Sequence, residues 1–305
     1  MENTPLISII TITRNRGYLI STAISSILQQ TYKNIEYIVV NGASTDNTVE
    51  IVNSFNDQRI KLINLEKNFS FPQSINIGVN NSSGEYLTFL DDDDEYLPSK
   101  IEKQFNLIRN LPQEYGFVYC WMDYFDKKTQ NKIKEHHPKL KGFIPDEVVE
   151  RPIISGTPTL FFRKESFISL GGFKDDIGII SDWELAARAC QIYKVDFVPE
   201  ALVKVYVNHG SKRMSDKYYY KGILTKNIIF HLHFLKEFKN VFDKYPPKKN
   251  NHLYSIARSY FLLGKWKQGE HFYKALINNT ITVKYILLPF YCFFLRIIQN
   301  GNKNK

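Results

Sequence analysis

Four consecutive aspartates, Asp91 to Asp94, follow a short apolar run at residues 86–90. Adjacent carboxylates repel one another, so a folded chain keeps four of them together only beside solvent, a cation or a metal-bound phosphate. Mg²⁺ and Mn²⁺ prefer oxygen ligands and usually bind between one or two carboxylates and a substrate diphosphate. A solvated acidic loop is the alternative. The aspartates end a predicted strand, where α/β proteins bind their ligands, and this position favours a site for a metal and a nucleotide.

The elements that must position these aspartates alternate between strand and helix. Runs rich in β-branched and aromatic residues predict strands, and apolar residues at helical spacing predict the helices between them. Such alternation is typical of βαβ units with a largely parallel sheet. The loops at 13–16, 41–46 and 91–94 should therefore meet at one edge of the sheet, where a nucleotide would bind. We expect strands at 6–13, 35–40, 60–64 and 86–90, and helices at 19–28, 49–55 and 72–80.

The later part of the chain mixes short strands with a helical end. Residues 126–141 are expected to form a charged connector, and residues 252–278 resemble one tetratricopeptide unit, which cannot bury its own apolar face alone. The apolar stretch 281–298 is interrupted by Lys284 and Pro289, so it suits a membrane interface better than a full span, with a buried core helix as the alternative. We expect a further helix at 98–110 and strands at 117–123, within 153–163 and at 203–208.

Charge is distributed unevenly along the chain. The net charge is +9, but residues 1–200 hold 21 basic and 27 acidic side chains, whereas residues 201–305 hold 19 basic and 4 acidic ones. A basic end of this kind points to an anionic partner, either a membrane surface or nucleic acid. No basic stripe accompanies the aspartates, which argues against nucleic acid as the substrate. The cysteines at 120, 190 and 292 lack metal-ligand spacing, so we expect reduced thiols in a cytosolic protein.

Four segments of the first 100 residues resemble, in order and spacing, a family-two glycosyltransferase with the GT-A fold. The subgroup most similar carries Asp-Gly-Gly-Ser-Thr-Asp after its second strand, and an Ala-Met-Asn-Lys-Gly-like segment that reads Ser74-Ile75-Asn76-Ile77-Gly78 here. The resemblance implies a Rossmann-like three-layer sandwich with a mostly parallel central sheet, followed by a C-terminal helical extension. The four segments are residues 7–15, 27–32, 39–46 and 89–94.

The same resemblance assigns roles at the donor site. Asp93, with Asp91, would be the DxD-type ligand of Mn²⁺ or Mg²⁺, and Asp91 or Asp92 would face the ribose or diphosphate. Asn41 departs from the family, because an aspartate usually accepts a hydrogen bond from uracil there, while an amide adds a donor and loses the charge. A UDP-sugar is still expected, and an ordinary turn residue is the alternative for Asn41. The other residues expected to hold the donor are Thr13, Arg14, Asn15, Ser44, Asn76, His209 and Arg213.

The acceptor side of the resemblance centres on Asp182. This residue matches the family's catalytic base at the start of a helix, although Ser181 replaces the commoner glutamate before it. A helix N-cap is the structural alternative for Asp182. Gly171 and Gly172 match a Gly-Gly-Phe turn and should allow positive φ or a close backbone approach. His209 could instead be solvent-exposed.

Together these features predict an inverting enzyme that moves one sugar from a nucleotide diphosphosugar. One base and no enzyme nucleophile imply single displacement, and the Gln-x-x-Arg-Trp signature of processive synthases is absent from the sequence. The resemblance and the basic end imply a saccharide or lipid-linked acceptor in bacterial surface polysaccharide assembly, at the inner face of the cytoplasmic membrane. The alternatives are a sugar nucleotidyltransferase, for which residues 13–17 are a poor phosphate loop, and a non-catalytic carbohydrate- or nucleotide-sugar-binding protein.

These expectations divide the chain into two regions. A catalytic domain is expected at 1–215, with a nucleotide-sugar-binding half at 1–100 and an acceptor-binding half at 101–215. A basic helical region that associates with membranes is expected at 216–305.

Overall fold

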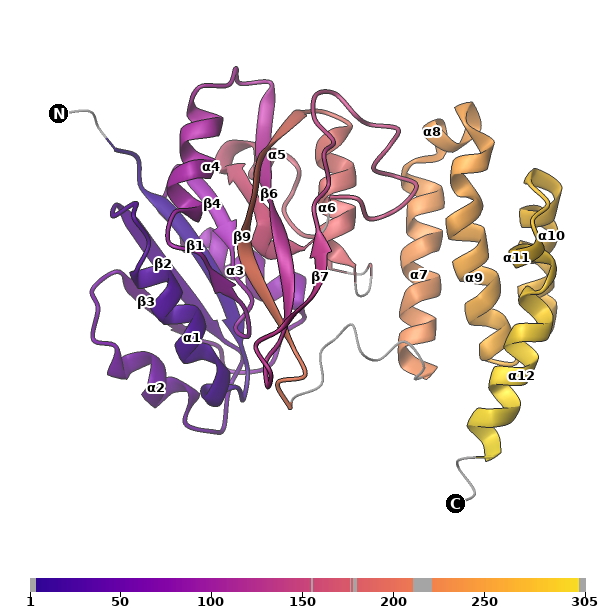
Figure 1. Ribbon diagram of the computed structural model, residues 1–305, viewed down its shortest axis with the longest axis horizontal. Helices are drawn as coiled ribbons and strands as arrows, with labels where there is room; N and C mark the ends of the chain where they lie inside the picture. Colours follow the sequence, from indigo (N-terminus) through magenta and orange to yellow (C-terminus); the bar gives the residue numbers. More distant parts are fainter. Residues whose placement is uncertain (1–3, 155, 176, 178–179, 211–220, 302–305) are drawn as a thin grey trace. The chain divides into compact units, whose positions relative to one another are not determined.

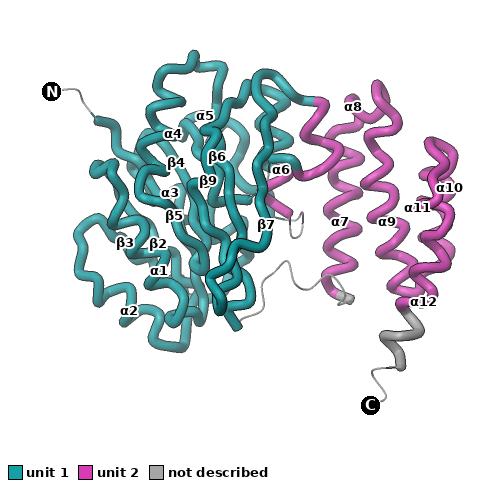
Figure 2. The backbone as a smooth tube through the Cα atoms, in the orientation of Figure 1, with its two compact units in different colours: residues 1–145, 153–175, 185–211 teal, residues 146–152, 176–184, 212–305 magenta. Residues whose placement is uncertain are grey.

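The computed structural model describes residues 4–154, 156–175, 177, 180–210 and 221–301 (Figure 1). The backbone forms two compact units (Figure 2). Unit 1 comprises residues 1–145, 153–175 and 185–211, and unit 2 comprises residues 146–152, 176–184 and 212–305. The expected domain boundary at residue 215 lies outside the described residues.

Unit 1 is built on a mixed sheet with the strand order β3-β2-β1-β4-β8-β6-β9-β5, to which β7 adds beside β6. Strands β3, β2, β1 and β4 run parallel, as do β6 and β9, while the remaining pairs are antiparallel. The strands are β1 (Ile7–Thr13), β2 (Ile35–Asn41), β3 (Ile60–Asn64), β4 (Tyr86–Phe89), β5 (Glu95–Tyr96), β6 (Tyr115–Asp126), β7 (Lys132–His136), β8 (Leu160–Arg163) and β9 (Lys194–Val207).

Helices cover both faces of the sheet because successive strand residues point to opposite sides. On one side, Ile9 and Val39 belong to a core cluster that includes apolar residues of α1 and α4. On the other side, a Cβ at Gly78 of α3 would lie 2.6 Å from the Ile10 side chain, so α3 packs directly on the sheet. The result is a three-layer arrangement. The helices of this part of the chain are α1 (Gly17–Leu28), α2 (Thr48–Ser54), α3 (Phe71–Asn80), α4 (Lys100–Arg109) and α5 (Lys164–Ser169), with the 3-10 turn η1 (Thr157–Thr159). Helix α6 (Ser181–Cys190) follows, and its first four residues belong to unit 2.

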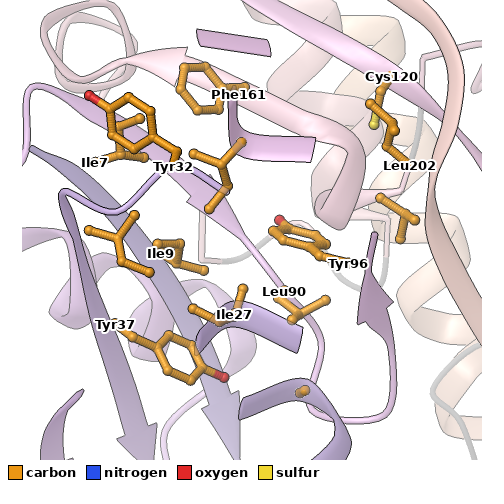
Figure 3. Packing of buried hydrophobic residues seen from close by; sticks show 14 of the residues in the cluster. Ile7, Ile9, Ile27, Tyr32, Tyr37, Leu90, Tyr96, Cys120, Phe161 and Leu202 are labelled. Carbon is orange, nitrogen blue, oxygen red and sulfur yellow. The ribbon is translucent and has the colours of Figure 1, made fainter. Parts of the chain in front are cut away.

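The core beneath the aspartates is apolar and rich in aromatic rings. Figure 3 shows Ile9, Ile27, Tyr37 and Leu90 packed within it. Leu90 precedes the aspartates, and its backbone is fixed by two hydrogen bonds to β1: its N–H donates to Ile10 O at 3.0 Å, and Thr11 Oγ1 donates to its carbonyl at 2.7 Å. The start of the acidic loop is therefore anchored to the sheet.

Three strands differ from the sequence expectations. The connector expected at 126–141 contains strand β7, which is exposed over most of its length and pairs with β6. Charged residues are common on edge strands because they discourage further pairing. The charged residues of β7 were therefore interpreted as a connector rather than as a strand. The two-residue strand β5 was not expected from the sequence. Strand β9 was expected at 203–208 but begins at Lys194.

Unit 2 consists mainly of helices. The helical pair expected within 252–278 is confirmed as α9 and α10, where a Cβ at Gly269 would lie 2.5 Å from the Phe261 ring, so the two helices approach closely. Within the ranges given above, no helix is both long and apolar enough to cross a membrane. The elements are α7 (Lys221–Glu237), α8 (Lys239–Lys244), η3 (Pro246–Lys249), α9 (Asn250–Leu262), α10 (Trp266–Asn279), α11 (Val283–Ile286) and α12 (Leu288–Gly301).

Candidate functional site

Three carboxylates converge after β4. Asp91, Asp93 and Asp94 each offer one oxygen, and these oxygens all lie within 4.8 Å of one another. Asp93 and Asp94 are buried and Asp91 is half-buried. Oxygen donors of this kind fit Mn²⁺ or Mg²⁺, so the residues present suit the predicted ion. Asp94 also accepts a hydrogen bond from the backbone N–H of Tyr206 at 3.1 Å, so it ties the acidic loop to β9.

Arg16 supplies a positive charge to this acidic loop. Its Nη1 lies 2.7 Å from Asp92 Oδ1 and 3.1 Å from Asp93 Oδ2. Burial raises the pKa of Asp92 to about 6, although the charge of Arg16 opposes that rise. Burial alone would lower the pKa of Arg16, but the negative charges of Asp92 and Asp93 outweigh this effect and raise its pKa. Sequence reasoning did not single out Arg16, although its place in the 13–16 loop was the available signal.

His209, which follows β9, approaches Asp93. Its Nε2 lies 3.1 Å from Asp93 Oδ2, and its side chain is only 1% exposed. The solvent-exposed alternative for His209 is therefore wrong. A second basic residue expected nearby, Arg213, lies outside the described residues.

The loops after β1 and β2 are joined by hydrogen bonds. Gly42 N–H donates to Thr13 O at 2.9 Å, and Asn15 N–H donates to Ser44 Oγ at 2.9 Å. Asn15, which has a φ of +52°, also accepts from the backbone N–H of Thr45 at 2.7 Å. Thr13, Asn15 and Ser44 are thus brought together, as expected. Arg14 in the same loop is exposed to solvent.

Asn41 is the buried last residue of β2. Its Nδ2 donates to Asn64 Oδ1 at 2.9 Å, and its Oδ1 accepts from the backbone N–H of Ser44 at 3.2 Å. The second bond orders the following loop, as the turn-residue alternative predicts. A carbonyl oxygen can accept two hydrogen bonds, so Oδ1 also retains the capacity to bind a nucleobase N–H.

The predicted Gly-Gly-Phe turn packs against α3. Gly171 and Gly172 have φ of +74° and +67°, which confirms the expected left-handed backbone. Asn76 Nδ2 donates to Phe173 O at 2.8 Å, and Phe173 N–H donates to Asn76 Oδ1 at 3.1 Å. Arg188 donates to the carbonyls of Leu170 and Gly172 and fixes the turn from α6. The amide of Asn76 therefore holds this turn, and its contact with the donor stays a prediction.

Asp182 lies in the first turn of α6, which begins at Ser181, and is half-buried. It is therefore inside the helix rather than at the N-cap position. Its neighbours are tied into unit 2: Trp183 Nε1 donates to Val148 O at 2.6 Å, and the buried Glu184 lies 3.4 Å from His233 Nε2. Asp182 belongs to unit 2 and the aspartate cluster to unit 1, so a joint reaction centre is a proposal.

Comparisons with known proteins identify the family of the chain. Residues 8–171 match the family described as Glycosyl transferase family 2. An uncharacterised glycosyltransferase of Rickettsia typhi is 33% identical over 208 residues, which cover 67% of this chain and 64% of the relative. The chain thus spans just under two thirds of that relative's length.

Solved structures show the fold. TarS 1–349 of S. aureus, in complex with UDP-GlcNAc, has a TM-score of 0.63 and 17% identity, and the match covers 93% of this chain and 90% of TarS 1–349. The mannosyltransferase PcManGT of Pyrobaculum calidifontis, in complex with GDP-Man and Mn²⁺, has a TM-score of 0.56 and 18% identity over 97% of this chain and 81% of its own. The fold is the GT-A fold, as the motifs implied, and the chain belongs to glycosyltransferase family 2.

Proposed function

We propose that this chain transfers a single sugar, with inversion, from a nucleotide diphosphosugar to a saccharide or lipid-linked saccharide acceptor. The observation that carries the proposal is the carboxylate cluster of Asp91, Asp93 and Asp94 within 4.8 Å, at the sheet edge where the loops after β1 and β2 are joined. Arg16 and His209 both lie within 3.1 Å of Asp93 Oδ2. This combination suits a diphosphate bound with a divalent cation.

Departure of the nucleoside diphosphate requires stabilisation of its negative charge. Asp91 and Asp93, with Asp94 beside them, would hold Mn²⁺ or Mg²⁺, which when bound supplies electrostatic stabilisation of a diphosphate. Arg16 keeps a fixed positive charge next to Asp92 and Asp93. The residues proposed to hold the rest of the donor are Thr13, Arg14, Asn15, Asn41, Ser44, Asn76, Asp92, His209 and Arg213.

The acceptor hydroxyl must lose its proton as it attacks the anomeric carbon, and a carboxylate within hydrogen-bond reach can accept it. Asp182 is proposed for this role because it is half-buried at the start of α6 and matches the family's base. A single carboxylate that acts as base, with no nucleophile of the protein, gives one displacement and inversion.

UDP is the proposed nucleotide. Asn41 Oδ1 offers an acceptor to an imide N–H of uracil, and one structural neighbour is a complex with UDP-GlcNAc. The complex of another neighbour with GDP-Man makes the guanosine donor the natural competitor. We further propose that the chain acts in bacterial surface polysaccharide assembly at the inner face of the cytoplasmic membrane, with its basic C-terminal region against anionic lipid.

A donor panel tests the proposal. The full chain is incubated with UDP- and GDP-sugars, with Mn²⁺ or with EDTA, and release of nucleoside diphosphate and binding of each donor are measured. We expect Mn²⁺-dependent binding and slow hydrolysis of one UDP-sugar. Binding without hydrolysis or transfer to any acceptor would favour a non-catalytic nucleotide-sugar-binding protein, and no binding of any donor would refute the proposal.

A further inference from the structure

The last helix of the described chain, α12, is apolar on two opposite faces. Its inner face carries Leu288 and Cys292, which are fully buried, and Leu295, which packs on the same cluster. The spacing of these residues, i, i+4 and i+7, follows one side of a helix. The cluster includes Phe261 and Leu262, so α12 is held against α9.

The outer face of α12 is exposed and equally apolar. Phe290, Phe293 and Phe294 are 65%, 53% and 64% exposed, and Ile286 and Leu287, just before α12, are also exposed. Surface helices of globular proteins normally turn polar residues to water, and a helix that is apolar all round is normally covered on all sides. Contiguous exposed apolar patches of this kind usually mark an interaction surface.

Aromatic and basic residues border this face. The Trp266 ring, which is partly exposed, lies 6.4 Å from the Phe293 ring, and exposed Lys265 and Lys267 flank that tryptophan. Lys284 is also exposed, with its Nζ 4.4 Å from the Tyr254 ring. We call the set Ile286, Leu287, Phe290, Phe293, Phe294 and Trp266 the α12 surface.

The helical region that carries the α12 surface is strongly basic. Residues 221–301 contain 13 basic and 3 acidic side chains, a net charge of +10. Aromatic and aliphatic side chains beside lysines are the composition of segments that lie in the headgroup region of a bilayer. Each lysine near an anionic membrane adds electrostatic attraction. A second copy of the chain would instead bring two regions of +10 together, and like charges repel.

We infer that the α12 surface docks on an anionic lipid bilayer, with Phe290, Phe293 and Phe294 inserted at the headgroup boundary and the lysines facing lipid headgroups. This inference rests on the proposed function, because it assigns the membrane contact to one face of one helix. It also explains why α12 keeps two apolar faces: the inner one holds the helix on α9 and the outer one meets lipid.

Vesicle co-sedimentation of the full chain tests the inference. We use vesicles of phosphatidylglycerol and phosphatidylcholine in equal amounts, and vesicles of phosphatidylcholine alone. We expect binding to the mixed vesicles, weakened by salt, and a fall of about tenfold or more in the partition coefficient for the double variant Phe290→Gln and Phe294→Gln. The matched control, Phe143→Gln with Ile168→Gln, removes two exposed apolar side chains of unit 1 and should bind as the wild type does.

Three further measurements separate the outcomes. Replacing Lys265, Lys267 and Lys284 by glutamine should weaken binding to the mixed vesicles and reduce its salt dependence. Sedimentation equilibrium measures whether the chain forms a dimer. If the wild type is a dimer that does not bind vesicles, and the Phe290→Gln and Phe294→Gln variant is a monomer, the inference is overturned in favour of a second copy as the partner. An equal loss in the control pair would overturn it too. Hydrolysis of a soluble donor, measured without vesicles, should persist in the α12 variant, whereas its absence from the wild type would refute only the enzymatic proposal.

Discussion

Replacement of Arg16 by methionine is the most direct probe of the acidic loop. Arg16 Nη1 lies 2.7 Å from Asp92 and 3.1 Å from Asp93, and the side chains of these aspartates are 5% and 6% exposed. Methionine keeps much of the apolar stem but removes the charge, which leaves two buried carboxylates without this partner. We expect the variant to fold with reduced stability in EDTA.

The size of the loss follows from burial. Removing one partner of a fully buried ion pair typically costs about 3–5 kcal/mol. The Arg16 side chain is 23% exposed, so solvent screens part of the interaction, and we expect a decrease of about 2–3 kcal/mol in the free energy of unfolding. Arg59 is the matched control, because its side chain is 25% exposed but its partner Asp57 is 22% exposed. The change Arg59→Met should cost less than about 1 kcal/mol.

Urea unfolding followed by circular dichroism measures both variants, in EDTA and in millimolar Mn²⁺. A divalent cation bound by Asp93 would supply positive charge that Arg16 supplied before, so the loss for Arg16→Met should be smaller in Mn²⁺ than in EDTA. An equal loss for the Arg16 and Arg59 variants would refute the burial argument. A loss unchanged by Mn²⁺ would refute metal binding at Asp93.

Three other predictions concern the base, the metal ligand and the acid stability of unit 2. Asp182→Asn should abolish sugar transfer while donor affinity, measured by calorimetry, stays within about twofold of wild type; wild-type turnover would sink the base assignment. Asp93→Ala should remove the Mn²⁺ dependence of donor binding, and the same calorimetry with EDTA checks it. Burial lowers the pKa of His252 from 6.5 to about 4, and it lowers the pKa of His231, 3.0 Å away, as well. As the pH is lowered, the unfolded chain therefore takes up protons before the folded one. The free energy of unfolding should accordingly decrease as the pH falls from 6.5 to 4, by about 3 kcal/mol from His252 alone. Urea unfolding at several pH values should show a weaker pH dependence for His252→Phe.

The strands that carry the site were predictable because their own residues determine them. Strands β1, β2 and β3 were expected within one residue of their observed bounds, since β1 and β2 consist largely of β-branched residues and three of the five residues of β3 are aliphatic. The parallel order then placed the loops after β1, β2 and β4 at one edge, and the register confirms it, because Thr13 pairs with Asn41 and Ile10 pairs with Phe89. Strand β7 escaped prediction because its residues reflect an exposed edge rather than a core.

Contacts between distant residues could not be predicted in the same way. Arg16 and Asp92 are 76 positions apart, and the bond that joins Asn76 to Phe173 spans 97 positions. Neither pair has a local pattern, since a charged residue after a strand or an asparagine within a helix is common. The motif resemblance assigned Asn76 to the donor, whereas the structure adds the turn at Gly172 that the amide holds.

Three of the four aspartates have different partners, which helps the chain to keep the four carboxylates adjacent. Asp92 contacts Arg16, Asp93 lies near both Arg16 and His209, and Asp94 accepts the backbone N–H of Tyr206. A cation that binds Asp93 would therefore approach a carboxylate that Arg16 already neutralises in part, and their like charges would repel. Arg16 should accordingly weaken binding of the metal alone and favour binding of the metal together with the diphosphate, whose negative charge can offset both. This coupling would make the acidic loop selective for the metal–nucleotide complex over the free ion.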